Sequence, residues 1–232
     1  MATIALIGAD GSGKTTIARM ILDSPPVKMK YLYMGLNTES SNYALPTSRM
    51  IYYLKLLKYK RKNKNLKNTK LKNLSLHELN DNRSVDNRSN LGAIARLLNR
   101  LAEAWYRQLI SWIFQLRGYT VLYDRHYLFD SSSNQTGDDL KKQRLTTKIH
   151  IWMINNMYSK PDLVILLHAP AEILFQRKGE ADIEYLEERT KSFMMVGKRL
   201  NNFVVVDATN PIDKVFDDTK NEILKFINFN KN

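Results

Sequence analysis

The chain has 232 residues, 44% of them apolar, with three Trp, twelve Tyr and no Cys. This length and composition fit one globular domain with a full hydrophobic core, and the lack of Cys excludes disulfides and thiolate chemistry. No apolar run approaches the roughly 20 residues of a membrane-spanning helix, and no basic leader precedes the first apolar run. We therefore expect a single soluble domain, residues 1–232, in the cytoplasm.

The formal net charge of +13 is concentrated in one part of the chain. Ten Lys and Arg residues and no acidic residue lie between Ser40 and His77, and the rest of the chain carries only about +3. Residues 61–90 are rich in Lys and Asn and lack aromatic side chains, so we expect a mobile insertion there. Such a run is most simply a solvated surface; the functional alternative is docking to nucleic acid or anionic lipid.

The spacing of apolar residues predicts strands and helices that alternate along the chain. In chain order we expect a strand at 3–7, a helix from Gly13 to Leu22, a strand at 28–35, helices at 43–59 and 91–117, a strand at 119–126, a helix at 139–158, a strand at 161–168, a helix from Ala171, a helix ending near Leu200, a strand at 202–209 and a helix from Pro211. Strands that alternate with helices and are apolar throughout are typical of a parallel sheet covered on both faces. We predict a three-layer α/β fold with five parallel strands.

The segment GADGSGKT fits the G-x-x-x-x-G-K-[ST] pattern and lies between the first strand and the first helix. Its glycines let backbone N–H groups converge on phosphate oxygens, and the N-terminus of the helix adds its dipole. Lys14 can reach the β- and γ-phosphates, and the Thr15 hydroxyl can hold Mg²⁺. A chance glycine-rich turn is the alternative. The predicted ATP-binding residues of this P-loop are Gly8, Gly11, Ser12, Gly13, Lys14, Thr15 and Thr16.

A second group of polar residues follows the third strand. In VLYDRHYLF, Asp124 lies at the carboxyl end of a buried strand, where open α/β sheets bind ligands. Asp124 can hold Mg²⁺ directly or through water, and Arg125 can grip a phosphate in its planar fork. The alternative is a turn-capping Asp with Arg as its surface partner. Asp124 is not followed by the x-x-G of GTPase switch regions, and no N-K-x-D motif occurs, so we do not expect a GTPase.

These segments resemble thymidylate kinases and their relatives among the nucleoside-monophosphate kinases. The resemblance rests on GADGSGKTT at 8–16, DRH at 124–126, PDLVILLHAPAEILFQRKGE at 161–180 and VVVDATNP at 204–211. It covers most of the chain and implies transfer of a phosphoryl group from ATP, with Mg²⁺, on a sheet of five parallel strands. The small-molecule acceptor expected from it is a nucleoside monophosphate, or a related phosphorylated or hydroxylated metabolite.

The resemblance assigns a role to each of the residues already singled out. It implies that Lys14 and Thr15 serve ATP and Mg²⁺, that Asp124 is the metal-side acid, and that Arg125 contacts the acceptor phosphate. It also explains Asp10, an acid inside an anion-binding loop, as a group that accepts a hydrogen bond from an acceptor hydroxyl. The alternative is that Asp10 stabilises the loop through an Asx turn.

Two further segments take their roles from the same resemblance. Arg177 and Lys178 occupy the start of the family's mobile lid, about 177–185, where fixed cations stabilise the transferring phosphoryl group. A solvated helix end whose cations complement the helix dipole is the alternative. DATNP resembles the loop that flanks adenine, so Thr209 and Asn210 are candidate contacts. The predicted catalytic residues are Asp10, Lys14, Arg125, Arg177 and Lys178.

The acceptor half departs from the family pattern. Where thymidylate kinases carry an R-E-P-G-type segment after the second strand, this chain reads YMGLNTESSN, and the nearest arginine is Arg49. The helix before DRH offers four cationic or stacking groups that are not in the family's register: Arg96, Arg100, Trp105 and Arg107. The identity of the acceptor and the existence of a homodimer stay open. A second candidate function also stays open, that of a P-loop ATPase that binds nucleic acid through its basic stretch.

Overall fold

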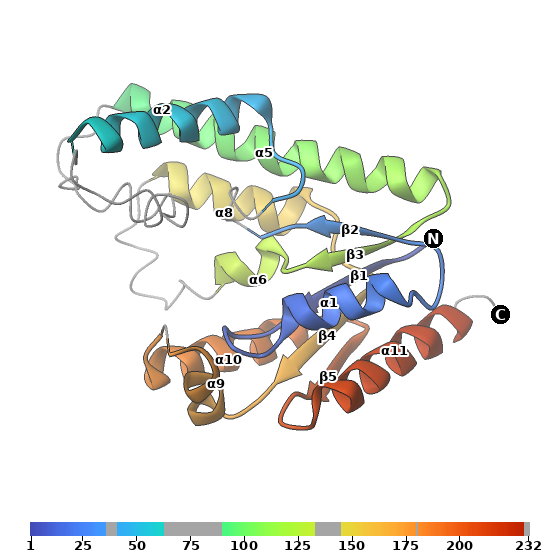
Figure 1. Cartoon of the computed structure of the whole chain (residues 1–232). Coiled ribbons are helices and arrows are strands. Elements are labelled where there is room, and N and C mark those ends of the chain that lie inside the picture. Colours follow the sequence, from blue (N-terminus) through green and yellow to red (C-terminus); the bar gives the residue numbers. More distant parts are fainter. Residues whose placement is uncertain (36–40, 63–89, 133–144, 180, 230–232) are drawn as a thin grey trace.

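The computed structural model describes residues 1–35, 41–62, 90–132, 145–179 and 181–229. Its five strands form one sheet in which every neighbouring pair is parallel. The strands are β1 (Thr3–Ile7), β2 (Met29–Tyr33), β3 (Thr120–Asp124), β4 (Leu163–His168) and β5 (Phe203–Asp207). Their order, β2-β3-β1-β4-β5, confirms the predicted five-stranded parallel sheet (Figure 1).

The helices follow the predicted alternation with changes at their ends. They are α1 (Lys14–Asp23), α2 (Pro46–Lys62), α5 (Asn90–Leu116), α6 (Tyr127–Ser132), α8 (Leu145–Met157), α9 (Ala171–Lys178), α10 (Ile183–Gly197) and α11 (Ile212–Phe229). The second helix was expected from Tyr43 but begins at Pro46, because proline suits the first turn, where its missing N–H would have no partner. The short helix α6 was not predicted.

Most of the expected insertion at 61–90 lies outside the described residues, and its two ends belong to helices. Helix α2 continues to Lys62 and α5 begins at Asn90, so both ends of the expected insertion are helical. Residues 63–89 lie outside the described residues, as do the first residues of the helix expected at 139–158. Lys is a good helix former, which explains why a Lys-rich end can extend α2.

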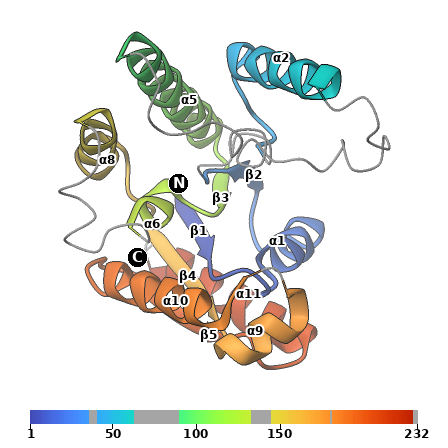
Figure 2. The ribbon, with the colours of Figure 1, turned by 90° about the vertical axis from the view of Figure 1, so that its left-hand side faces the viewer.

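Helices cover both faces of the sheet, which gives the predicted three layers (Figure 2). Successive residues of β1 point to opposite faces, so Ile4 and Leu6 join one core cluster while Ala5 and Ile7 join the other. The first cluster is completed by α1 and α11, and the second by α6 and α10 with α5 packed against it. All five residues of β1 are buried, as expected for a central parallel strand. None of the described helices is both long and apolar enough to cross a membrane.

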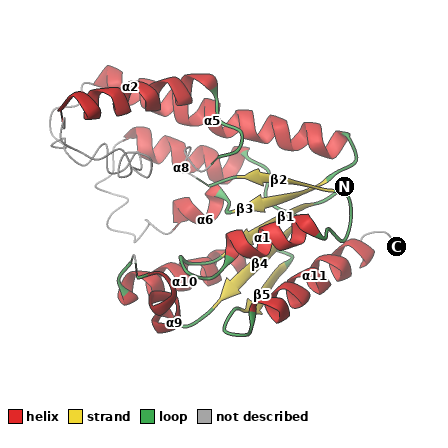
Figure 3. Cartoon of the chain, viewed as in Figure 1, coloured by secondary structure: helices red, strands yellow, loops and turns green. Residues whose placement is uncertain are grey.

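All five strands point the same way, so their carboxyl ends form one edge of the sheet (Figure 3). Strand β1 has β3 on one side and β4 on the other, although β2 lies between β1 and β3 in the sequence. In the β1–β3 register Leu6 pairs with Asp124. The loop after β1 and the residues that end β3 therefore share this edge, at the point where the strand order reverses and where α/β sheets bind ligands.

A buried ion pair ties the segment after β2 to α5. Arg107 Nη2 lies 3.0 Å from Glu103 Oε1, and the two side chains are only 3% and 4% exposed. Glu103 Oε2 accepts hydrogen bonds from Leu45 N (3.0 Å) and Ser48 Oγ (2.8 Å). Arg107 Nη1 donates to Gly35 O (2.6 Å). Both charges thus have the additional partners that a buried ion pair requires, and the pair fixes where the chain runs after β2.

We predict that Glu103→Ala lowers the free energy of unfolding by about 3–5 kcal/mol, because it leaves the Arg107 charge buried without a partner. Urea denaturation measures the change. The matched control is Glu187→Ala, which removes the exposed pair with Lys191 (3.2 Å) and should cost less than about 1 kcal/mol. Equal losses in the two variants would contradict a special role for the buried pair.

Candidate active site at the carboxyl edge of the sheet

The loop between β1 and α1 has a backbone that requires glycine. Gly11 has a φ of +89°, and a Cβ at this position would lie 2.6 Å from Leu174 O of α9. Gly13 has a φ of +85° and directly precedes α1. A side chain at Gly11 would both strain the backbone and collide with α9. The glycine spacing in the sequence therefore has a local structural cause, and it brings the loop to the N-terminus of α1, where the helix dipole is positive.

Lys14 is folded back into this loop. Its side chain is 5% exposed, and Nζ donates to Ala9 O at 2.8 Å and lies 3.4 Å from Ser12 Oγ. Burial away from water, together with the positive charge of Arg125, lowers the pKa of Lys14 from 10.5 to about 7. Nearby carboxylates oppose this shift only in part. The ammonium group is therefore close to losing its proton at neutral pH.

Asp10, the acid in the middle of the loop, forms an ion pair with Arg125. Arg125 Nη2 donates to Asp10 Oδ1 at 2.8 Å, and each side chain is 28% exposed. Burial alone would raise the pKa of Asp10, but the charges of Arg125, Lys14 and Lys178 hold it below 3.8. Asp10 is therefore an ionised acceptor of hydrogen bonds at neutral pH.

Arg125 has an unusual backbone conformation. Its φ is +64°, and it is the one non-glycine residue of the described part of the chain with a positive φ. This left-handed conformation costs roughly 1–2 kcal/mol for a residue with a Cβ. Its N–H still donates to Leu6 O (3.1 Å), so the turn comes immediately after the sheet. A Cβ on Gly35 would lie 3.1 Å from Arg125 Cδ, so glycine at the end of the β2 segment leaves room for this side chain.

Asp124 has one carboxylate oxygen that is fixed and one that has no partner. The side chain is buried, and Oδ2 accepts a hydrogen bond from Tyr31 OH at 2.8 Å and lies 3.5 Å from Thr15 Oγ1. Burial and the Asp124 charge raise the pKa of Tyr31 well above 10, so its hydroxyl remains a donor. Oδ1 is buried and has no hydrogen-bond partner among the described residues.

These atoms suit Mg²⁺, which prefers oxygen ligands and usually binds one or two carboxylates together with substrate phosphates. The Thr15 hydroxyl and the Asp124 carboxylate, whose Oγ1 and Oδ2 atoms lie 3.5 Å apart, are such oxygen groups beside the phosphate loop. The described residues contain no group of three or more His, Asp or Glu that could hold a metal by itself. A metal at this position would therefore depend on the phosphates of a bound nucleotide.

The expected lid at 177–185 spans the end of α9, the turn that follows it and the first residues of α10, and residue 180 lies outside the described residues. Arg177 Nη1 donates to Ala208 O (2.8 Å), so its guanidinium is directed to the loop after β5. The charge of Lys178, by contrast, helps to lower the pKa of Asp10. The two cations thus act on different sides of the phosphate loop.

Thr209 and Asn210 lie in a loop that closes on itself. Thr209 N and Oγ1 donate to Asp207 Oδ1 at 2.9 and 2.7 Å, and Asn210 Nδ2 donates to Asp207 O (3.3 Å). A Cβ on Gly13 would lie 3.9 Å from Ile212 Cδ1, so the start of α11 reaches the phosphate loop. The candidate adenine loop is therefore a neighbour of the predicted phosphate site.

Sequence reasoning missed two residues of this region. Tyr31 contacts Asp124, and Arg189 of α10 is largely buried and contributes to the lowered pKa of Lys14. Arg189 lies over the Phe193 ring (5.0 Å from its centroid), with Nη1 3.4 Å from Tyr185 OH. Neither residue belongs to a motif. For Tyr31 the one available signal was its place on a strand that ends at the functional edge of the sheet.

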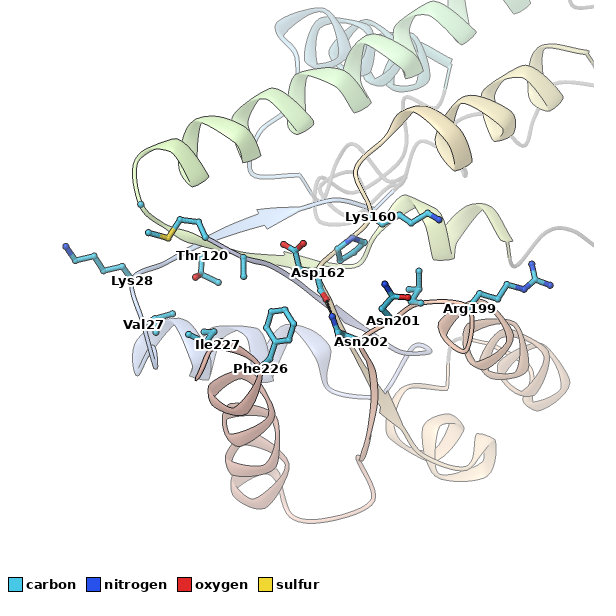
Figure 4. Close-up of a pocket in the computed structure, with 15 residues that line it drawn as sticks. Val27, Lys28, Thr120, Lys160, Asp162, Arg199, Asn201, Asn202, Phe226 and Ile227 are labelled. Carbon is cyan, nitrogen blue, oxygen red and sulfur yellow. Dashed lines mark hydrogen bonds between the residues drawn. The ribbon is translucent and has the colours of Figure 1, made fainter. Parts of the chain in front are cut away.

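A cavity of about 850 Å³ lies away from these residues (Figure 4). It is lined by residues at the amino ends of the strands and by Phe226 and Ile227 of α11, and it includes no phosphate-loop residue. The charged ends of Lys28, Lys160 and Arg199 point outward from it (Figure 4). The volume of this cavity is therefore no guide to the active site, which we assign to the carboxyl edge of the sheet.

Comparison with known proteins adds a family relationship to this geometry. No family model matches the chain. The chain is 26% identical to "Probable thymidylate kinase 1" of Saccharolobus solfataricus over 229 residues, which is 96% of this chain and 92% of that protein. The chain is thus similar over nearly its whole length to a protein named as a thymidylate kinase. It is also 28% identical to "Thymidylate kinase" of Thermosipho melanesiensis over 112 residues and 30% identical to "Probable thymidylate kinase" of Archaeoglobus fulgidus over 122 residues. These two matches cover 45% and 50% of this chain and span only 55% and 58% of those relatives.

The predicted site residues fall into two neighbouring groups at one edge of the sheet. Both groups meet at the phosphate loop, through contacts that are described above. The first group, beside β1 and β3, consists of Asp10, Lys14, Thr15, Asp124 and Arg125. The second, beside β5 and α9, consists of Arg177, Thr209 and Asn210.

The lowered pKa of Lys14 predicts that the stability of the protein depends on pH. Between pH 7 and 10.5 the unfolded chain holds the Lys14 proton and the folded chain does not, so the free energy of unfolding should rise with pH there. The slope is at most about 1.4 kcal/mol per pH unit. Lys14→Met removes this dependence: it should stabilise the ligand-free protein at pH 7 and below, and the gain should shrink toward pH 10.5.

Urea denaturation at pH 6, 7.5 and 9 tests this prediction. The matched control is Lys191→Met, which replaces a lysine whose side chain is 74% exposed and should leave the pH profile of the parent protein unchanged. If Lys14→Met retains the parent's profile, the lysine titrates normally in the folded loop.

Proposed function

We propose that the chain transfers the γ-phosphoryl group of ATP to a small-molecule acceptor, and that this acceptor is a nucleoside monophosphate. The observation that carries the proposal is the convergence of Asp124 and Arg125 on the phosphate loop, through the 3.5 Å approach of Asp124 to Thr15 and the 2.8 Å ion pair of Arg125 with Asp10. A phosphate loop alone serves many reactions, whereas an acid and a cation on its two sides are the groups that phosphoryl transfer needs. The similarity to proteins named thymidylate kinase supports the same reaction class.

On the nucleotide side, Lys14 would neutralise the β- and γ-phosphates, and Thr15 and Asp124 would hold Mg²⁺. The metal would neutralise charge on the phosphate oxygens. Thr209 and Asn210, next to the start of α11, would contact the adenine, and Arg177 would hold α9 against that loop. These assignments are consistent with the short distance between the β5–α11 segment and Gly13.

On the acceptor side, Arg125 would bind the acceptor phosphate in its planar fork and Asp10 would accept a hydrogen bond from a hydroxyl. Their ion pair, with Arg125 Nη2 2.8 Å from Asp10 Oδ1, supports the assignment of both residues to one side of the loop. Lys178, whose charge acts on Asp10, is the lid cation that we assign to the transferring phosphoryl group. Arg177, which is directed to Ala208 O, is assigned instead to the loop that would contact the adenine base.

The test is a panel of acceptors incubated with ATP and Mg²⁺, with the products identified by mass spectrometry. It should include the four deoxynucleoside and four ribonucleoside monophosphates, their nucleosides, and phosphorylated sugars. We expect a diphosphate product from one or a few monophosphates. ATP consumption without any phosphorylated acceptor would contradict the proposal.

If Asp10 contacts the acceptor, its substitution should impair the kinetics for the acceptor but not the affinity for ATP. Asp10→Asn keeps the size of the side chain and removes its charge, so ATP affinity should stay the same or tighten. The kcat/KM for the acceptor should fall by roughly ten- to a thousandfold, the size expected for the loss of one charged hydrogen bond. Separate titrations of ATP and acceptor measure the two effects. Unchanged acceptor kinetics would leave Asp10 with a structural role in the loop.

A second candidate function is a nucleic-acid-stimulated ATPase, which the ten Lys and Arg residues between Ser40 and His77 favour. Replacing residues 63–89 by a short Gly–Ser bridge removes four of these ten residues, leaves the six in α2, and removes none of the site residues described above. For a small-molecule kinase, we expect the variant to fold and to retain phosphoryl transfer. The second candidate is tested by measuring the rate of ATP hydrolysis with and without DNA or RNA. If nucleic acid stimulates hydrolysis by the parent protein but not by the variant, the second candidate is supported.

A further inference from the structure

The register of the sheet brings Tyr31 to the acid at the end of β3. In the parallel pairing of β2 with β3, Tyr31 lies opposite Leu122, and both belong to the core cluster on the α1 face. Side chains of a strand alternate between faces, so Asp124, two residues beyond Leu122, returns to this face. An aromatic side chain is long enough to reach such a diagonal neighbour on the adjacent strand. The contact of Tyr31 with Asp124 is therefore a consequence of strand register.

The contact makes the two oxygens of Asp124 different. Oδ2 receives the Tyr31 hydroxyl at 2.8 Å, whereas Oδ1 is buried and has no hydrogen-bond partner in the described part of the chain. The terminal torsion of an aspartate is broad and roughly two-fold, so without such a contact the two oxygens could exchange places. The Tyr31 hydroxyl therefore selects one orientation of the carboxylate.

Tyr31 is itself held in place from the outer side of β2. Asn42 Nδ2 donates to Tyr31 O at 3.0 Å, and Asn42 Oδ1 accepts a hydrogen bond from Tyr33 N at 3.1 Å. These bonds occupy backbone groups of the edge strand on the side that no other strand covers. The donor that orients Asp124 is thus part of a fixed strand rather than of a loop.

We propose that Tyr31 is a positioning residue, which fixes the Asp124 carboxylate beside the Thr15 hydroxyl in one orientation for the Mg²⁺ of the bound nucleotide. The inference rests on the proposed function, because it concerns the metal that accompanies ATP. Mg²⁺ demands nearly ideal octahedral geometry, so a carboxylate held in one orientation serves it better than one that rotates. Groups that orient metal ligands typically contribute about 10- to 100-fold in metal affinity.

The test measures how strongly Mg²⁺ and nucleotide support each other's binding. The dissociation constant of a non-hydrolysable ATP analogue is determined by calorimetry in excess Mg²⁺ and again in EDTA. The constant in EDTA divided by the constant in Mg²⁺ reports the contribution of the metal. In Tyr31→Phe this ratio should fall about 10- to 100-fold, with the constant in EDTA unchanged. In the Asp124→Asn background, Tyr31→Phe should have no further effect, because the two residues act as one unit.

The matched control is Tyr123→Phe, on the neighbouring strand, which loses a hydroxyl bonded to Ser111 Oγ (2.6 Å) instead. Its ratio should equal that of the parent. A Tyr31→Phe protein that keeps the parental ratio, or one that changes only the constant in EDTA, overturns the inference and leaves the proposed function intact. A parent protein whose affinity for the analogue is the same in Mg²⁺ and in EDTA overturns both, so the two failures are distinguishable.

Discussion

The parallel pairing of β1 with β3 is the constraint on which the site depends. Because Leu6 lies opposite Asp124, the loop that follows β1 and the turn that follows β3 begin at the same height of the sheet. Arg125 N donates to Leu6 O at the last point of this ladder, and the left-handed turn at Arg125 then directs its side chain to Asp10. The strain at Arg125 is tolerated because the ladder, the ion pair and the glycine at position 35 all specify the same conformation.

The acceptor side is supported from a distance by the buried pair of Glu103 with Arg107. Arg107 donates to Gly35 O, and a side chain at Gly35 would crowd both the Tyr33 ring and the stem of Arg125. The buried charge of Arg107 is thus connected, through Gly35, to Arg125, the arginine that we assign to the acceptor phosphate. Residues of α5 can thus affect the acceptor site without contacting a ligand, through the path of the chain after β2.

The sequence predicts those parts of the molecule that local rules determine. The five strands follow from apolar runs, and the phosphate loop follows from glycines such as Gly11, whose backbone tolerates no other residue. The partners of the site residues could not be predicted in the same way. Tyr31 and Asp124 are 93 residues apart and Asp10 and Arg125 are 115 apart, and only the strand order brings them together.

Arg107 is a residue for which the sequence indicated a role that the structure does not support. Its place on a helix beside the DRH strand indicated a cation available to an acceptor, yet Glu103, one turn earlier, pairs with it inside the protein. An i, i+4 pair looks the same in a sequence whether it is exposed or buried. The burial of this pair follows from the packing of α2 on α5, which no local pattern specifies.

The phosphate loop holds a lysine whose pKa is about 7, and this gives the proposed nucleotide site a proton equilibrium of its own. The negative charges of a polyphosphate favour the protonated ammonium, so above neutral pH each binding event should take up a proton from the buffer. The apparent binding enthalpy would then vary with the ionisation enthalpy of that buffer. By reciprocity, the proton would act as a positive effector of nucleotide affinity, which would weaken steadily as the solution becomes alkaline.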